Sequence, residues 1–178
     1  IVMIHGWPLS GAAFADNAKV LAAAGYRVIT YDRRGFGQSG KPRDGYDYDT
    51  LAADLDALLT GLDLRDAVLL GFSMGGGEVA RYLATRGSER VGAAILSGSI
   101  CPALCITKDN PDGAMPREGF QELADACAAD HAGFVDQFCG WFYSNDQGLT
   151  VPEEVRRRAV EIARQSAPHA AVATILAW

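Results

Sequence analysis

Residues 67–86 read AVLLGFSMGGGEVARYLATR, and this stretch decides the fold. The apolar run Ala67–Gly71 predicts a buried strand, and Met74–Arg86 predicts the helix that follows it. Between them, G-F-S-M-G at 71–75 matches G-x-S-x-G at a strand-to-helix turn. Such a turn lifts the hydroxyl of its serine clear of the sheet, so we expect Ser73 to be a nucleophile. Glycines on either side leave room for neighbouring backbone. These elbow-shaping glycines are Gly71 and Gly75.

The residues around this stretch alternate between strand and helix. Apolar, β-rich runs at 1–5, 27–31 and 91–97 predict three further strands. Helical stretches such as Ala12–Ala24 can cross from one strand to the next, which gives a parallel sheet. Because the runs are almost continuously apolar, we expect strands that are buried on both faces. The predicted fold class is α/β, a parallel sheet flanked by helices, over residues 1–100.

Beyond residue 100 the pattern becomes helical. Prolines and glycines over residues 102–116 predict a loop, and apolar residues at helical spacing follow it. Thr150–Glu153 matches a capping box and predicts a helix that runs to Gln165. Residues 170–178 fit either a helix or a strand, and we favour a helix. We interpret residues 101–178 as an incomplete helical cap on the sheet.

Two backbone amides are candidates for stabilising negative charge that develops beside Ser73. The Met74 N–H lies at the start of a helix, whose dipole attracts an oxyanion. His5-Gly6-Trp7-Pro8 follows the first strand, where a hydrolase places its other donor, and we assign that role to the Trp7 N–H. We expect the His5 side chain to hold this loop rather than to act as a base.

The chain contains four longer motifs: HGWPLSG (5–11), YDRRGFGQSG (31–40), GYDYDTLAADL (45–55) and GFSMGGGEVARY (71–82). Together they resemble the cofactor-free haloperoxidase and aryl-esterase branch of the α/β-hydrolase family. The resemblance implies hydrolysis of a small-molecule acyl or aryl ester through an acyl-enzyme, with Ser73 as nucleophile and Trp7 and Met74 as oxyanion donors. It implies no cofactor. It also implies a side reaction in which hydrogen peroxide gives peracids, which oxidise halide without metal or haem.

The remaining members of a catalytic triad are harder to place. Asp146 and His169 satisfy the order Ser…Asp…His, and His131 is another candidate base. We do not expect these residues to complete the triad, because all three belong to the predicted cap rather than to strand ends. Both chain ends fall inside apolar runs. We therefore expect an inactive fragment that lacks the triad acid and histidine.

Other functions stay open at this point. A non-catalytic, ligand-binding domain with a hydrolase fold would have the same sequence features, and carbon–carbon bond hydrolysis also uses a serine. Gly35–Gly40 matches the dinucleotide-binding pattern G-x-G-x-x-G, but a loop follows it instead of a helix, so we do not predict a nucleotide site. Aromatic residues near the elbow could line a substrate pocket, although we favour plain core packing for them. They are Trp7, Phe72, Phe138, Trp141 and Phe142.

Composition limits the classes of molecule that we expect this protein to bind. The 178 residues carry a net charge of −6, which argues against a nucleic-acid partner. No apolar run reaches the roughly 20 residues that cross a bilayer, so we expect no membrane partner. The four cysteines match no zinc-ligand spacing, and we expect free thiols, no metal and a cytoplasmic location. Oligomers are possible, since we expect unpaired strand edges on the sheet.

Overall fold

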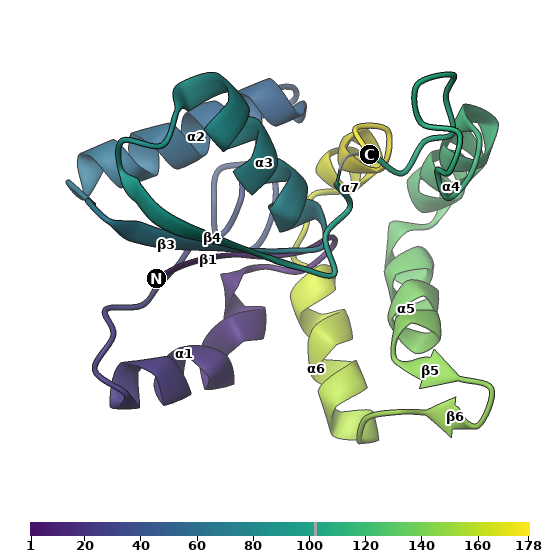
Figure 1. The fold of residues 1–178 in the computed structure, drawn as a ribbon. Coiled ribbons are helices and arrows are strands. Elements are labelled where there is room, and N and C mark those ends of the chain that lie inside the picture. Colours follow the sequence, from purple (N-terminus) through teal and green to yellow (C-terminus); the bar gives the residue numbers. More distant parts are fainter. Residues whose placement is uncertain (102) are drawn as a thin grey trace.

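A four-stranded parallel sheet forms the centre of the molecule (Figure 1). The computed structural model describes residues 1–101 and 103–178; Pro102, in the predicted loop, lies outside the described residues. The strands are β1 (Val2–Ile4), β2 (Ile29–Thr30), β3 (Ala67–Phe72) and β4 (Val91–Ser97), in the order β2-β1-β3-β4. All neighbours pair in parallel, which confirms the predicted α/β class.

Helices cover the two faces of the sheet unequally. Helices α2 (Tyr48–Gly61) and α3 (Met74–Arg86) pack on one face, and the 3₁₀ helix η1 (Gly11–Phe14) and α1 (Ala15–Ala23) lie on the other (Figure 1). α2 begins after Asp47, whose side chain accepts a hydrogen bond from the Thr50 N–H. Leu55 and Leu59 of α2 are fully buried in a cluster with residues of the sheet and α3, whereas α1 has no buried residue.

The later helices gather beyond the carboxyl ends of the strands (Figure 1). They are α4 (Arg117–Ala129), α5 (His131–Phe142), α6 (Glu153–Ala163) and α7 (Pro168–Ile175), with a small hairpin of β5 (Ser144–Asn145) and β6 (Gly148–Leu149). α7 confirms that a helix rather than a strand follows residue 167. The largest cluster of buried side chains joins both parts of the chain, from Trp7 and Met74 to Phe120 and Ile175. The division at residue 100 stays a prediction.

Two local expectations are wrong. Thr150 does not cap α6, because its hydroxyl donates to the carbonyl oxygen of Tyr143, and α6 begins only after Pro152. Strands β2 and β4 are not buried on both faces: Thr30 and residues 92–97 are exposed. The physical reason is that the side chains of residues 92–97 join none of the core clusters of the described residues, so the helices leave both faces of this edge strand uncovered.

Candidate active site

Ser73 occupies the turn between β3 and α3. Its backbone has φ 53° and ψ −119°, a conformation that costs a non-glycine residue about 1–3 kcal/mol. The Ser73 N–H donates to the Ser97 carbonyl oxygen at 3.0 Å, and the Gly76 N–H donates to the Ser73 carbonyl oxygen at 2.9 Å. Its hydroxyl makes no hydrogen bond with the described residues, so it remains available to a ligand.

Glycines allow α3 to begin directly against β1. A Cβ added at Gly75 would lie 2.2 Å from the Ile4 carbonyl oxygen, and one at Gly71 would lie 2.4 Å from the Gly75 carbonyl oxygen. No side chain fits in either place. The first turn of α3, which carries the candidate donor Met74, is therefore held at the end of β1.

The loop after β1 lies against the nucleophile. A Cβ added at Gly6 would approach the Ser73 Cβ to 3.0 Å, and the next residue, Trp7, is 5% exposed. The backbone amides of Trp7 and Met74 donate to no acceptor in the described part of the chain. Two unpaired amides beside a serine hydroxyl form the arrangement that an oxyanion hole needs.

His5 holds this loop, as expected. Its Nε2 accepts a hydrogen bond from the Arg33 N–H at 3.0 Å, and its Nδ1 lies 2.9 Å from the Gly6 carbonyl oxygen. Burial, together with the nearby positive charge of Arg33, lowers the pKa of His5 well below its usual value. Because both ring nitrogens are engaged in hydrogen bonds of the loop, we do not consider His5 a base for Ser73.

Sequence reasoning missed a buried ion pair behind the loop. Arg33 Nε lies 2.7 Å from Glu78 Oε2, and both side chains are 1% exposed. The signal was present, because Glu78 lies on the face of α3 that also carries the buried residues Val79 and Tyr82. A lone carboxylate on an apolar helix face needs a buried partner.

An apolar cavity of about 440 Å³ opens in front of Ser73. Four of the five aromatic residues singled out from the sequence line it: Trp7, Phe138, Trp141 and Phe142. Trp7 and Phe138 also belong to the core packing, as we favoured, and a substrate pocket lined by the four stays a prediction. The Phe138 and Trp7 rings meet edge to face, with centroids 4.8 Å apart. Apart from the serine hydroxyl, the cavity wall is almost entirely aromatic and aliphatic, which suits an uncharged organic group.

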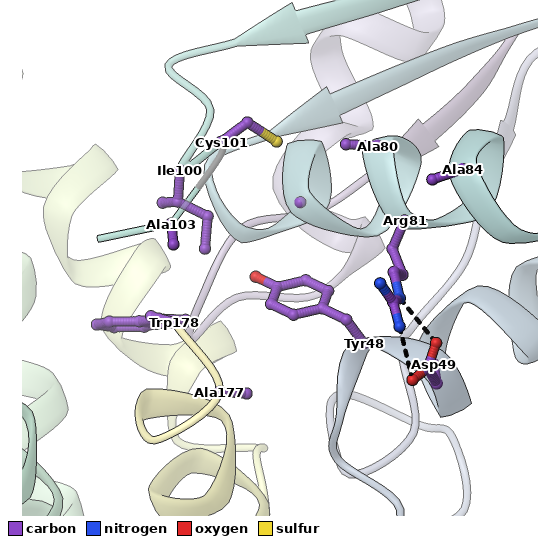
Figure 2. A pocket seen from close by; sticks show the side chains of 11 residues that line it. Tyr48, Asp49, Ala80, Arg81, Ala84, Ile100, Cys101, Ala103, Ala177 and Trp178 are labelled. Carbon is purple, nitrogen blue, oxygen red and sulfur yellow. Dashed lines mark hydrogen bonds and ion pairs between the residues drawn. The ribbon is translucent and has the colours of Figure 1, made fainter. Parts of the chain in front are cut away.

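A second cavity, of about 700 Å³, does not reach Ser73. Figure 2 shows Tyr48, the Arg81–Asp49 ion pair and Cys101 around it. Ile100 and Trp178 line both cavities and lie between them. Because Ser73 does not line it, we do not place the chemistry in this larger space.

The three other candidate triad residues lie away from the nucleophile. His131 Nε2 bonds the Ser166 hydroxyl at 2.9 Å, and His169 Nε2 lies 2.7 Å from the Pro42 carbonyl oxygen. Asp146 is exposed in the turn between β5 and β6. Within the described residues, none of the three hydrogen-bonds the Ser73 hydroxyl.

Four further expectations concern the cysteines, a metal ion, a membrane-spanning helix and a nucleotide site. All four cysteines are free thiols, and Cys127 and Cys139 are buried. Over the described residues, no cluster of three or more His, Cys, Asp or Glu side chains is placed to bind a metal ion. Within the same residues, no helix combines the length and the apolar character that crossing a membrane requires. The glycines at 35–40 form a loop that is followed by further loop, and not a nucleotide-binding helix start.

Comparisons with known proteins identify the family and the fold. The family model of the alpha/beta hydrolase fold matches residues 1–164. A non-heme chloroperoxidase (CPO-A1) of Kitasatospora aureofaciens is 46% identical over 154 residues, which cover 86% of this chain and 56% of that protein. Among solved structures, a bromoperoxidase from Bacillus anthracis superposes with a TM-score of 0.94 at 41% identity, over 99% of this chain and 64% of that one.

An esterase from Exiguobacterium antarcticum is also similar, with a TM-score of 0.91 at 31% identity over 99% of this chain and 64% of that one. The chain thus spans little more than half the length of the curated relatives that it matches, 57% and 56% for two of them. The relatives include both haloperoxidases and esterases.

Proposed function

The chain belongs to the α/β-hydrolase family, and from that premise we propose that it carries the nucleophile and the oxyanion hole of a serine hydrolase acting on carboxylic esters. One observation supports this most strongly. The free Ser73 hydroxyl stands in a strained turn between two unpaired amides and an apolar cavity. That arrangement suits attack on an ester carbonyl and binding of the oxyanion that results.

The proposed reaction proceeds in two steps. Ser73 Oγ attacks the carbonyl carbon of the ester, and a general base takes the hydroxyl proton. The oxygen that becomes negative accepts hydrogen bonds from the Trp7 and Met74 amides. The tetrahedral intermediate then breaks its bond to the alcohol oxygen, which leaves with the proton returned by the base. Water cleaves the resulting acyl-enzyme to the carboxylic acid.

Hydrogen peroxide in place of water would give a peracid instead of the acid. The peracid can pass an oxygen atom to a halide ion, which yields hypohalite and the carboxylic acid. This side reaction fits the haloperoxidase names among the relatives, and it needs neither metal nor haem.

We further propose that the base and its acid partner come from outside these 178 residues. Each histidine is already engaged: His5 in the loop network, His131 with Ser166, and His169 with Pro42 and Tyr46. A base must reach the proton that it accepts, at about 2.6–3.2 Å. Extending the coding frame beyond residue 178 and finding a late Asp followed by a His would supply both groups.

The test compares the 178 residues alone with a protein extended to include that Asp and His. We expect the extended protein to hydrolyse a p-nitrophenyl ester with an initial burst of one p-nitrophenol per protein molecule. We expect Ser73→Ala to lower the rate of hydrolysis about 10⁶-fold. Ser88→Ala, at an exposed serine after α3, is the matched control and should keep full activity.

Two outcomes would contradict the proposal. Turnover by the Ser73→Ala protein at the level of the unmodified protein would remove the nucleophile assignment. Efficient turnover by the 178 residues alone, abolished by His169→Ala, would place the base inside the cap. An extended protein that binds esters without cleaving them would instead support the ligand-binding alternative.

A further inference from the structure

The Arg33–Glu78 pair is costly to bury, and stability alone does not account for it. The two side chains are 1% exposed and 2.7 Å apart. Replacing a buried ion pair by apolar residues of similar volume is often neutral or even stabilising. Both carboxylate oxygens are used, because Tyr31 donates its hydroxyl hydrogen to the second one, Oε1. A pair held so completely calls for a role in geometry.

The pair joins the two elements that provide the oxyanion donors. Glu78 belongs to α3, which begins with Met74. Arg33 Nη2 donates to the His5 carbonyl oxygen at 2.9 Å, and the Arg33 N–H donates to His5 Nε2 at 3.0 Å. His5 lies two residues before Trp7. The ion pair therefore connects the helix of one donor to the loop of the other.

His5 transmits this connection to a single peptide unit. Since Nε2 accepts from an amide N–H, the proton of the neutral ring is on Nδ1, which donates to the Gly6 carbonyl oxygen at 2.9 Å. The Leu9 N–H donates to the same oxygen at 3.0 Å. Gly6 C=O and Trp7 N–H belong to one planar trans peptide, in which they point in opposite directions. Fixing the oxygen on one side aims the Trp7 N–H to the other.

We propose that Arg33 and Glu78 are positioning residues that act through His5 to aim the Trp7 amide at the oxyanion. The inference rests on the proposed function of Ser73 and Trp7, and extends it to residues that do not touch the substrate. Close packing makes the loop sensitive to small shifts, because Gly6 lies against Ser73 and a Cβ at Gly75 would come within 3.0 Å of the His5 carbonyl oxygen.

The test uses Glu78→Gln in the extended, catalytically complete protein. The amide keeps the shape of the carboxylate but removes its charge, so Arg33 loses its counter-ion and is held less firmly. We expect kcat to fall about 10- to 100-fold, less than the 10²- to 10³-fold loss on deleting an oxyanion donor, while KM changes less than threefold. Asp54→Asn is the matched control: it breaks the neighbouring Arg34–Asp54 pair, which makes no contact with the loop, and should leave kcat unchanged.

A second variant separates positioning from stability. Arg33→Met combined with Glu78→Leu replaces the whole pair by apolar side chains, which should bring the melting temperature close to that of the unmodified protein. If the pair aims the amide, kcat stays low in this double variant, and a boronic acid that mimics the tetrahedral intermediate binds more weakly while the product acid binds as before. If the role is only structural, kcat and melting temperature recover together, which overturns the inference.

A readout without turnover is available from the 178 residues themselves. In ¹H–¹⁵N spectra, the Trp7 amide resonance should shift in Glu78→Gln and stay in place in Asp54→Asn. An unmoved Trp7 resonance together with an unchanged kcat in Glu78→Gln overturns the inference. Such a result leaves the proposed function intact, because the Ser73→Ala measurement tests that function separately.

Discussion

The indole Nε1–H of Trp7 donates a hydrogen bond to the carbonyl oxygen of Ala171 at 3.1 Å. Residue 7 follows the first strand and residue 171 lies in α7, so this bond joins the sheet to the helices beyond it. The side chain of Trp7 thus bonds α7, while its backbone amide, the proposed oxyanion donor, has no acceptor among the described residues. The two roles belong to different atoms, and this makes them separable by mutation.

Trp7→Phe should therefore affect stability more than catalysis. The phenyl ring keeps part of the apolar contact, but the Ala171 carbonyl oxygen loses its buried donor, which costs about 1–3 kcal/mol. Chemical denaturation of the 178 residues measures this loss. In the extended protein, kcat should stay within threefold, because the backbone N–H remains. A hundredfold loss of kcat with unchanged stability would contradict this separation.

Gly75→Ala should be strongly destabilising. The new methyl group would lie 2.2 Å from the Ile4 carbonyl oxygen, and backbone on both sides prevents easy relief. Overpacking of this kind costs roughly 1–3 kcal/mol or more. Gly140→Ala is the control in α5, where a Cβ meets nothing within 4 Å, and should gain about 0.5–1 kcal/mol from helix propensity. Equal melting temperatures for the two variants would refute the close approach of α3 and β1.

Stability should fall as the pH is lowered from 6.5 to 5. The pKa of His5 is well below 6.5 in the folded state, because of burial and the charge of Arg33, so the unfolded chain takes up a proton first. Stability is then fully present above about pH 6.5 and decreases below it, by up to about 1.4 kcal/mol per pH unit. Urea titrations at several pH values measure this slope.

His131 acts in the same direction, since burial lowers its pKa as well. His131→Asn removes the contribution of His131 to the pH dependence of stability and leaves the contribution of His5. The carboxyl group of Asp47, with a pKa lowered by hydrogen bonds from Thr50, titrates below this window. A flat stability between pH 6.5 and 5 in the His131→Asn variant would contradict a neutral, buried His5.

Tryptophan fluorescence should report directly on the cavity at Ser73. The chain has three tryptophans, Trp7, Trp141 and Trp178, and all of them line that cavity. An apolar cavity of about 150 Å³ holds benzene, so about 440 Å³ has room for a brominated phenyl ester, whose bromine quenches emission. Phe138→Asp should weaken the quenching at least tenfold. Arg81→Ala, in the second cavity, should leave it unchanged; equal effects of the two variants would place the ligand elsewhere.

The exposed edge strand β4 should promote self-association of the 178 residues. Ile95 and Leu96 are 47% and 49% exposed on a strand with one open edge, which is a template for pairing with another chain. Leu96→Lys should lower the aggregated fraction seen by light scattering. Val20→Lys is the control, because Val20 is 70% exposed but lies on α1. If both lysines reduce association equally, net charge and not the edge is responsible.

Local patterns predicted much of this molecule because they depend on neighbours in sequence. The alternation of apolar runs and helical stretches gave the four strands, and Met74–Arg86 is helical over the predicted residues. Where a local pattern competed with a distant contact, the prediction failed. Thr150 has the sequence of a cap, but its hydroxyl bonds Tyr143, so α6 begins later.

The sequence by itself determined the elbow around Ser73, since strand, glycines and helix start are all encoded within a few residues. Only the tertiary structure decided what surrounds it. The Arg33–Glu78 pair, the aromatic cavity and the free Trp7 amide each join residues tens of positions apart. No local propensity specifies such long-range contacts, because they arise from how the helices pack on the sheet. The exposure of β4 has the same origin: its apolar sequence favours burial, but the helices do not cover its two faces at the edge of the sheet.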